Sequence, residues 1–127
     1  MIFRKYVLLF CCFIFYACNI NIEKTIISNG LEISVQFNKL TTEKLYGSVI
    51  IKNNSNIIKN YSNRYLFFKY NENASRAYID SMSSMTIDFS EIEIQPSTIQ
   101  KYEIYFPINI PIIKKEIDKC SVTYQKD

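Results

Sequence analysis

The chain of 127 residues contains no histidine and no tryptophan, and it has only two glycines. Histidine is the commonest general base and a frequent metal ligand, so its absence removes most nucleophilic triads and most metal sites. Glycosidase chemistry needs a cleft in which two carboxyl groups have different environments, and a small glycine-poor domain gives no sign of one. We therefore expect a protein that is not an enzyme and that holds no metal or cofactor.

Long apolar stretches are also scarce, and the one that stands out lies at the N-terminus. Arg4 and Lys5 precede an apolar run over residues 6–17, which ends at Cys18 and is followed by the polar Asn19. A charged start, a short apolar run and a small residue before a cleavage site are typical of a secretory signal. The run is shorter than the roughly 20 residues that span a bilayer. We interpret residues 1–17 as a signal peptide and the rest as an exported protein.

Ala17 followed by Cys18 resembles the lipobox of bacterial lipoproteins. The resemblance implies that Cys18 becomes the lipidated first residue and attaches the protein to a membrane. Asn19 differs from the aspartate that retains some lipoproteins in the inner membrane, which favours the outer membrane or cell surface of a bacterium. Alternatively, the general signal peptidase releases an unlipidated protein in which Cys18 forms a disulfide with Cys120. Three Asn-X-Ser triplets also leave a eukaryotic secreted origin open.

The chain without its signal is nearly neutral. Removal of Arg4 and Lys5 leaves 13 of the 15 basic residues against 12 acidic ones. There is no block of lysine and arginine that would follow a phosphate backbone, so we expect no nucleic-acid partner. If Cys18 is lipidated, Cys120 is the single remaining thiol, and we then expect it to be a small buried apolar residue.

The remaining length suits one domain, which we place at residues 25–127 after a tether of residues 18–24. Alternating apolar residues predict a strand over residues 31–37, preceded by a hairpin turn at Asn29 and Gly30. Residues 45–52 predict a strand whose hairpin returns through Ile57 and Ile58, and residues 113–117 permit a short helix. Further strands are predicted at residues 65–70, where the strand is central, and at 85–89, 92–94, 102–106 and 120–124. Seven to eight short strands without long helices indicate an all-β antiparallel sandwich.

Three segments, at residues 49–55, 94–97 and 102–106, resemble the small immunoglobulin-like domains of bacterial lipoproteins of unassigned function. The resemblance extends over residues 31–106 and implies an immunoglobulin-like β-sandwich. The cysteine pair and core tryptophan of antibody domains are missing, so the resemblance concerns the broad sandwich class and transfers no functional residue. Secreted proteinase-inhibitor-like domains share the same layout.

Recognition of a partner is the function that these exclusions leave. Arg64 and Arg76, the only arginines after the signal, lie among Tyr61, Tyr65 and Tyr78, and both residue types are enriched at binding interfaces. The other interpretation is that these tyrosines pack at strand ends. We therefore predict a non-catalytic binding or structural module of the cell envelope, whose partner is another envelope protein or a glycan. The alternative is a secreted protease-inhibitor-like β-sandwich.

Overall fold

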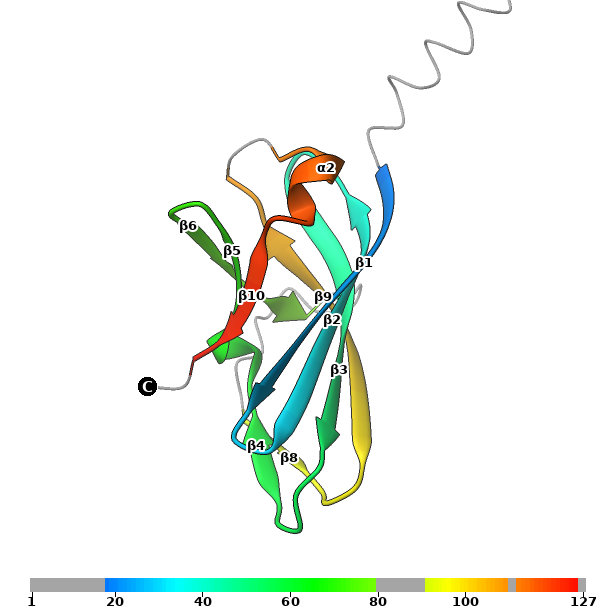
Figure 1. The fold of residues 1–127 in the computed structure, drawn as a ribbon, viewed down its shortest axis with the longest axis vertical. Helices are drawn as coiled ribbons and strands as arrows, with labels where there is room; N and C mark the ends of the chain where they lie inside the picture. Colours follow the sequence, from blue (N-terminus) through cyan, green and yellow to red (C-terminus); the bar gives the residue numbers. More distant parts are fainter. Residues whose placement is uncertain (1–17, 80–90, 110–111, 126–127) are drawn as a thin grey trace, which may run out of the picture.

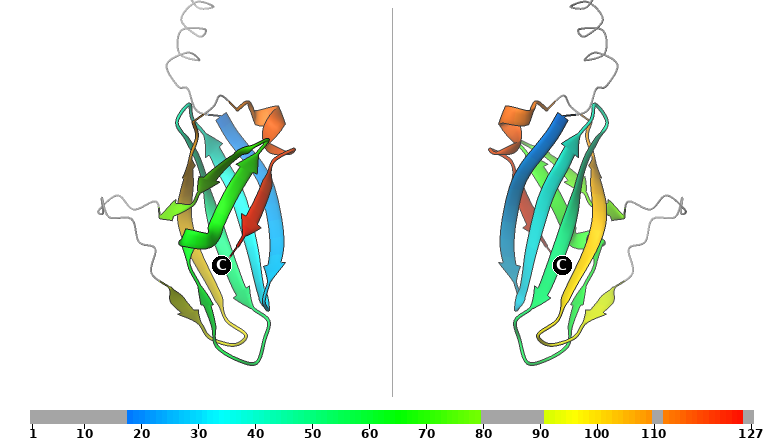
Figure 2. Two further views of the ribbon diagram at one scale, coloured as in Figure 1. Left: turned by 90° about the vertical axis from the view of Figure 1, so that its left-hand side faces the viewer. Right: turned by 90° about the vertical axis from the view of Figure 1, so that its right-hand side faces the viewer.

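The computed structural model describes residues 18–79, 91–109 and 112–125. These residues form antiparallel sheets, as the sequence predicts: a five-stranded sheet in the order β1-β2-β3-β9-β7, a three-stranded sheet in the order β10-β5-β6, and the pair β4-β8. Figures 1 and 2 show the two larger sheets facing each other as a sandwich. The strands are β1 (Cys18–Ser28), β2 (Leu31–Leu40), β3 (Lys44–Asn53), β4 (Lys59–Tyr61), β5 (Leu66–Tyr70), β6 (Asn73–Arg76), β7 (Tyr78–Ile79), β8 (Ile92–Ile94), β9 (Ile99–Pro107) and β10 (Ser121–Tyr124).

The first hairpin forms at the predicted turn. Asn29 and Gly30 adopt φ angles of 50° and 83°, and positive φ at two successive residues matches the twist of the strands that a two-residue loop connects. The strand that follows buries Leu31, Ile33 and Val35 and turns the intervening side chains outward. The local alternation of the sequence therefore decides which face of β2 enters the core.

Strand β1 begins at Cys18, which corrects the predicted tether over residues 18–24. Ile20 is buried, and the strand pairs with β2 from Cys18 opposite Leu40 onward, with one register shift between Asn19 and Ile22. Lys24 occupies an inward position of β1, so a charged residue interrupts the alternation of apolar and polar residues that would have indicated a strand. Its ammonium group reaches the backbone oxygen of Asp118 at 2.7 Å, which provides a polar partner for a half-buried lysine.

The second predicted hairpin does not form as expected. Ile57 and Ile58 belong to a connection, and β4 pairs with β8 rather than returning along β3. Strand β3 pairs instead with β9, from Lys44 opposite Pro107 to Lys52 opposite Ile99. This long-range pairing makes β3 a central strand. The strand predicted at residues 85–89 lies outside the described residues.

Three phenylalanines hold the two larger sheets together. Phe37 and Phe106 come from the five-stranded sheet and Phe68 comes from the three-stranded sheet, and the three ring-centroid separations are 5.7, 5.8 and 6.0 Å. Phe37 and Phe106 are fully buried and Phe68 is nearly so. Each such aromatic pair adds about 0.5–1.5 kcal/mol beyond the burial of its apolar area.

Three further expectations are confirmed. Strand β5 is central in its sheet, the helix α2 (Lys114–Ile117) occupies the predicted position, and Cys120 is a free and buried thiol. Its Sγ donates to the backbone oxygen of Glu116 at 3.2 Å. The all-β antiparallel class is thus confirmed, whereas the immunoglobulin-like connectivity stays a prediction.

Candidate functional site

The five residues predicted to bind a partner do not form one patch. Tyr61 is only 1% exposed, and its hydroxyl donates to Asn63 Oδ1 at 2.7 Å. Its ring stacks on Tyr124 with a centroid separation of 5.3 Å, and burial raises the pKa of this phenol well above its ordinary value. Tyr61 is therefore a core residue, and we correct the expectation that it contacts a partner.

The other four predicted residues are divided among a turn and the two larger sheets. Arg64 is exposed on the 3₁₀ turn η1 (Asn63–Tyr65), and the ring of Tyr65 packs roughly perpendicular to that of Tyr124, with a centroid separation of 5.9 Å. Arg76 lies over the ring of Phe67 at 5.3 Å, on the side of the three-stranded sheet. Tyr78 instead pairs with β9 in the five-stranded sheet. Tyr61 and Tyr65 both pack against Tyr124. They therefore fit the other interpretation of the sequence, packing at strand ends, better than a role in partner binding.

The long strands give the molecule two ends of different chemistry. We call the end where β1 begins at Cys18 the proximal end, and the end with the turn at Asn29 and Gly30 the distal end. Figure 1 shows α2 and the β2–β3 turn at the proximal end and the strands β4 and β8 at the distal end. The β1–β2 register, from Cys18 opposite Leu40 to Ser28 opposite Leu31, connects the two.

A row of tyrosines crosses the outer face of the five-stranded sheet at the proximal end. Lys39 pairs with Tyr46, and Tyr46 pairs with Tyr105, which in turn pairs with Tyr78. The neighbouring level, formed by Leu40, Leu45 and Phe106, is buried, so the four side chains of the row lie on the solvent side. We call Lys39, Tyr46, Tyr105 and Tyr78 the tyrosine row.

The rings of the tyrosine row stand against one another. Tyr78 and Tyr105 are stacked with an interplanar angle of 15°, and Tyr46 is tilted by 49° against Tyr105. The Nζ atom of Lys44 lies 4.5 Å from the Tyr105 ring centroid, and that of Lys39 lies 5.3 Å from the Tyr46 centroid. The tyrosine row therefore combines phenol rings that pack against one another with two ammonium groups held over ring faces.

The distal end instead exposes aliphatic side chains. Among the described residues, five large hydrophobic side chains are exposed, and four of them lie toward this end. Ile27 and Ile99 lie on the outer face of the sheet, in the level that pairs with Glu32 and Lys52. Their exposed fractions are 79% and 61%, and those of Ile57 and Ile58, in the connection after β3, are 62% and 49%.

Asn53 holds the connection that displays Ile57. The Asn53 side chain is fully buried, and its Nδ2 donates to the backbone oxygens of Ile57 and Ile94 at 2.8 and 2.9 Å. Its Oδ1 accepts from the backbone N and the hydroxyl of Ser55 at 2.9 and 2.6 Å. Both polar ends of one buried amide are therefore satisfied, which gives this loop a defined conformation. The sequence indicated only a turn here.

A groove opens beside this loop at the distal end. It encloses about 700 Å³, counting the part open to solvent, and lies between the first hairpin and the connection into β4. Lys59 Nζ approaches Asn29 Oδ1 across it at 3.5 Å. The residues that line it are Ser28, Asn29, Leu31, Ile57, Ile58, Lys59, Asn60 and Tyr124.

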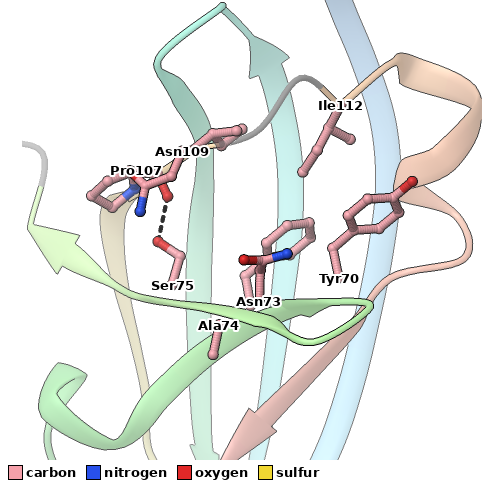
Figure 3. A pocket seen from close by; sticks show the side chains of 9 residues that line it. Tyr70, Asn73, Ala74, Ser75, Pro107, Asn109 and Ile112 are labelled. Atoms are coloured by element: carbon pink, nitrogen blue, oxygen red, sulfur yellow. Dashed lines mark hydrogen bonds between the residues drawn. The ribbon is translucent and has the colours of Figure 1, made fainter.

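A second pocket lies between the β5–β6 hairpin and the segment after β9 (Figure 3). It encloses about 340 Å³, with Phe68, Ile108 and Ile112 as its apolar lining. Ser75 lines this pocket, and its hydroxyl donates a hydrogen bond to the backbone oxygen of Pro107. Among the nine described residues that line this pocket none is a carboxylate, amine or thiol, so they provide no acid–base pair for catalysis.

The described residues contain no cluster of three or more potential metal ligands. None of the helices in the described part of the chain has the length and apolar character of a transmembrane span. Burial raises the pKa of the Cys120 thiol to about 11, which keeps it protonated and weakly nucleophilic at neutral pH.

Comparison with protein-family models, with curated proteins and with solved structures finds no significant match to this chain. The candidate sites are therefore inferred from the geometry of this structure alone. The sequence showed no signal for the tyrosine row, because Tyr46 and Tyr105 are 59 positions apart and meet only through the β3–β9 register.

Proposed function

We propose that this protein is a membrane-anchored extracytoplasmic lipoprotein, lipidated at Cys18, which acts as a non-catalytic binding module of the cell envelope. The observation that supports this function best is the segregation of exposed isoleucines toward the end opposite Cys18. An anchored domain must turn its anchor end to the membrane, so its partner has to bind elsewhere. The distal end is the surface that such an anchor leaves accessible.

The length of the sheet supports this orientation. Strand β1 has 11 residues, and at about 3.3 Å per residue it carries the chain roughly 33 Å from Cys18. The first hairpin and the β4–β8 pair would therefore stand well above the headgroup layer. A partner in the surrounding compartment would reach them without contacting lipid.

The exposed chemistry favours a protein partner over a glycan. Isoleucine side chains offer no hydrogen bonds to sugar hydroxyls, whereas they gain free energy when an apolar protein surface covers them. Ile57 and Ile58 lie next to a groove that a partner side chain can enter. Because Asn53 already holds their connection in place, binding would require little additional ordering of the loop.

The test combines mass measurement with cross-linking in the native host. Intact mass should show a lipid-modified Cys18 as the first residue. A photoreactive phenylalanine replacing Ile57 should give one discrete protein adduct, which an additional Ile58→Ser change reduces several-fold. The same amino acid replacing Glu23, an exposed residue at the middle of β1, serves as the matched control and should give none. Equal adducts from both positions would contradict the distal interface, and an unmodified Cys18 would contradict the anchor.

The Asn53 loop also favours a second candidate, the secreted protease-inhibitor-like function. Such an inhibitor needs a rigid exposed loop with an anchor side chain, and the bonds of Asn53 hold a loop that displays Ile57. The mature protein would then carry no lipid and would inhibit a protease that accepts branched aliphatic side chains. Ile57→Asp should weaken that inhibition at least about tenfold if Ile57 occupies the specificity pocket, whereas Lys101→Asp should leave it unchanged.

A further inference from the structure

The register places the tyrosine row next to the proposed anchor. Cys18 pairs with Leu40 and Asn19 pairs with Lys39, so the row begins one residue along the strand from Cys18. One residue corresponds to about 3.3 Å, and neighbouring strands are about 4.8 Å apart. The headgroup layer on each side of a bilayer is about 5–8 Å thick. If Cys18 carries a lipid, a row at this height falls within that layer.

The chemistry of the tyrosine row fits the same environment. Tyrosine is enriched at membrane interfaces, where its ring meets the apolar boundary and its hydroxyl stays in the polar layer. Tyr46, Tyr78 and Tyr105 are each partly exposed, so their rings have surface available for such contacts. Lys39 and Lys44 lie over two of these rings, and the long stem of a lysine lets its charge reach toward phosphate oxygens.

The helix α2 adds positive charge at the same end. Figure 1 shows α2 beside the beginning of β1, and its Lys114 and Lys115 are exposed. Glu43, in the β2–β3 turn, and Glu116, in α2, carry negative charge at this end. The carboxylate of Asp118 forms a weak ion pair with Lys24 at 3.9 Å. Ile113, the one exposed large hydrophobic among the described residues that is not at the distal end, precedes α2 directly.

We infer that the tyrosine row and Lys44 bind the anionic phospholipid headgroups of the membrane that holds the Cys18 lipid. This inference depends on the proposed lipidation. The anchor brings the row to the headgroups, and the two lysines supply the complementary charge. The contact would fix the orientation of the domain, with its distal end turned away from the membrane. An acidic segment of another protein is the competing occupant of this surface.

The test measures how fast a single surface cysteine reacts with a membrane-impermeant maleimide. Asn38→Cys places the thiol at the exposed residue beside Lys39, and Thr25→Cys provides the matched control on the same sheet face, opposite Ser34. The native Cys120 contributes little background because it is buried and protonated at neutral pH. The lipidated protein, verified by mass, is purified and reconstituted in vesicles of neutral phosphatidylcholine or with phosphatidylglycerol added.

Asn38→Cys should react about fivefold more slowly on the anionic vesicles than on the neutral ones, the effect expected for about one lysine–headgroup interaction. Thr25→Cys should react equally fast on both. Adding Lys39→Gln and Lys44→Gln to Asn38→Cys should remove most of the protection. Equal rates for Asn38→Cys on both vesicles would overturn the headgroup contact, as expected if an acidic protein segment is the true occupant. Protection that survives the loss of both lysines would overturn it too. A mass without lipid would overturn the anchor itself, so the two failures are distinguishable.

Discussion

At the proximal end the outer face of the five-stranded sheet carries phenol rings and ammonium groups, whereas the distal end exposes isoleucines. The same strands build both ends: β2 runs from Leu31 at the distal turn to Leu40 beside Cys18. Two surfaces of different chemistry on one rigid sheet can serve two different contacts. We propose that the proximal surface contacts lipid and that the distal surface contacts a protein.

The two ends also differ in what maintains their geometry. At the proximal end a β-bulge between Phe37 and Lys39 shifts the pairing of β2 with β3 by one residue. Without this shift Lys39 would face Leu45 in the core and Leu40 would turn outward, because a one-residue slip reverses the faces of a strand. At the distal end a single buried amide, Asn53, determines the course of the connection. Substitutions of Gly47 and of Asn53 test the geometry of the two ends separately.

Gly47→Ala should disrupt the proximal end. Gly47 is opposite Phe37 beside the bulge, and a Cβ at this position would overlap the backbone oxygen of Gln36. Because a backbone atom cannot rotate away, the two strands must separate, and we expect a loss of about 3 kcal/mol in the free energy of unfolding. Denaturant titration measures it. Asn38→Ala, at an exposed neighbouring position, is the control and should change stability by less than about 0.5 kcal/mol. A Gly47→Ala protein of normal stability would show that the bulge can relax.

Asn53→Ala should weaken the distal end. The change leaves the backbone oxygens of Ile57 and Ile94 without their amide donor and the Ser55 N–H without its acceptor. Because the hydrogen bond from Asn53 to Ile94 is buried, we expect a loss of about 2 kcal/mol in the free energy of unfolding. Hydrogen exchange should be faster in β4 and β8 and unchanged around Tyr46.

The control for this variant is Asn54→Ala. Asn54 is exposed, and its side chain donates only to Glu32 at 3.2 Å. The free energy of unfolding of this variant should therefore lie within about 0.5 kcal/mol of that of the unchanged protein. Equal losses for the two asparagines would mean that the burial of Asn53 has no special importance.

The smallest effect concerns pH and Cys120, which follows α2 at the proximal end. Burial raises the pKa of its thiol from 9.0 to about 11. The folded state therefore holds this proton more tightly than the unfolded state, so its contribution to stability is constant below about pH 9 and decreases as the pH rises toward 11. Native-state alkylation of the thiol should keep accelerating up to about pH 11. A rate that levels off near pH 9 would indicate that the proximal end opens readily around α2.

Much of the fold follows from local pattern. The alternation in β2, the Asn29–Gly30 turn and the short helix α2 were predictable, because period-two burial, positive φ and short-range spacing are properties of neighbouring residues. The antiparallel sandwich class follows from the number and spacing of such strands. The strand at residues 18–24 was missed because Lys24 occupies an inward position and finds its partner, Asp118, 94 residues away.

The candidate site was less predictable. Tyr61 and Tyr65 are close to Arg64 in sequence, yet the fold packs their rings against Tyr124. Exposure of a tyrosine depends on what the opposite sheet places over it, which composition does not reveal. Ile57 and Ile58 look like a returning strand until the side-chain bonds of Asn53 divert the chain toward β8.

Local sequence pattern therefore accounts for much of the secondary structure of this protein, for the inward and outward faces of its clearest strands, and for the scarcity of catalytic side chains. The fold brings Tyr46 beside Tyr105 and Lys44 over that ring, and it places the exposed isoleucines at the opposite end. The physical reason is the range of the interactions. Alternation is set by the backbone of adjacent residues, whereas register depends on a bulge, a buried amide and strand pairs that are far apart in the chain.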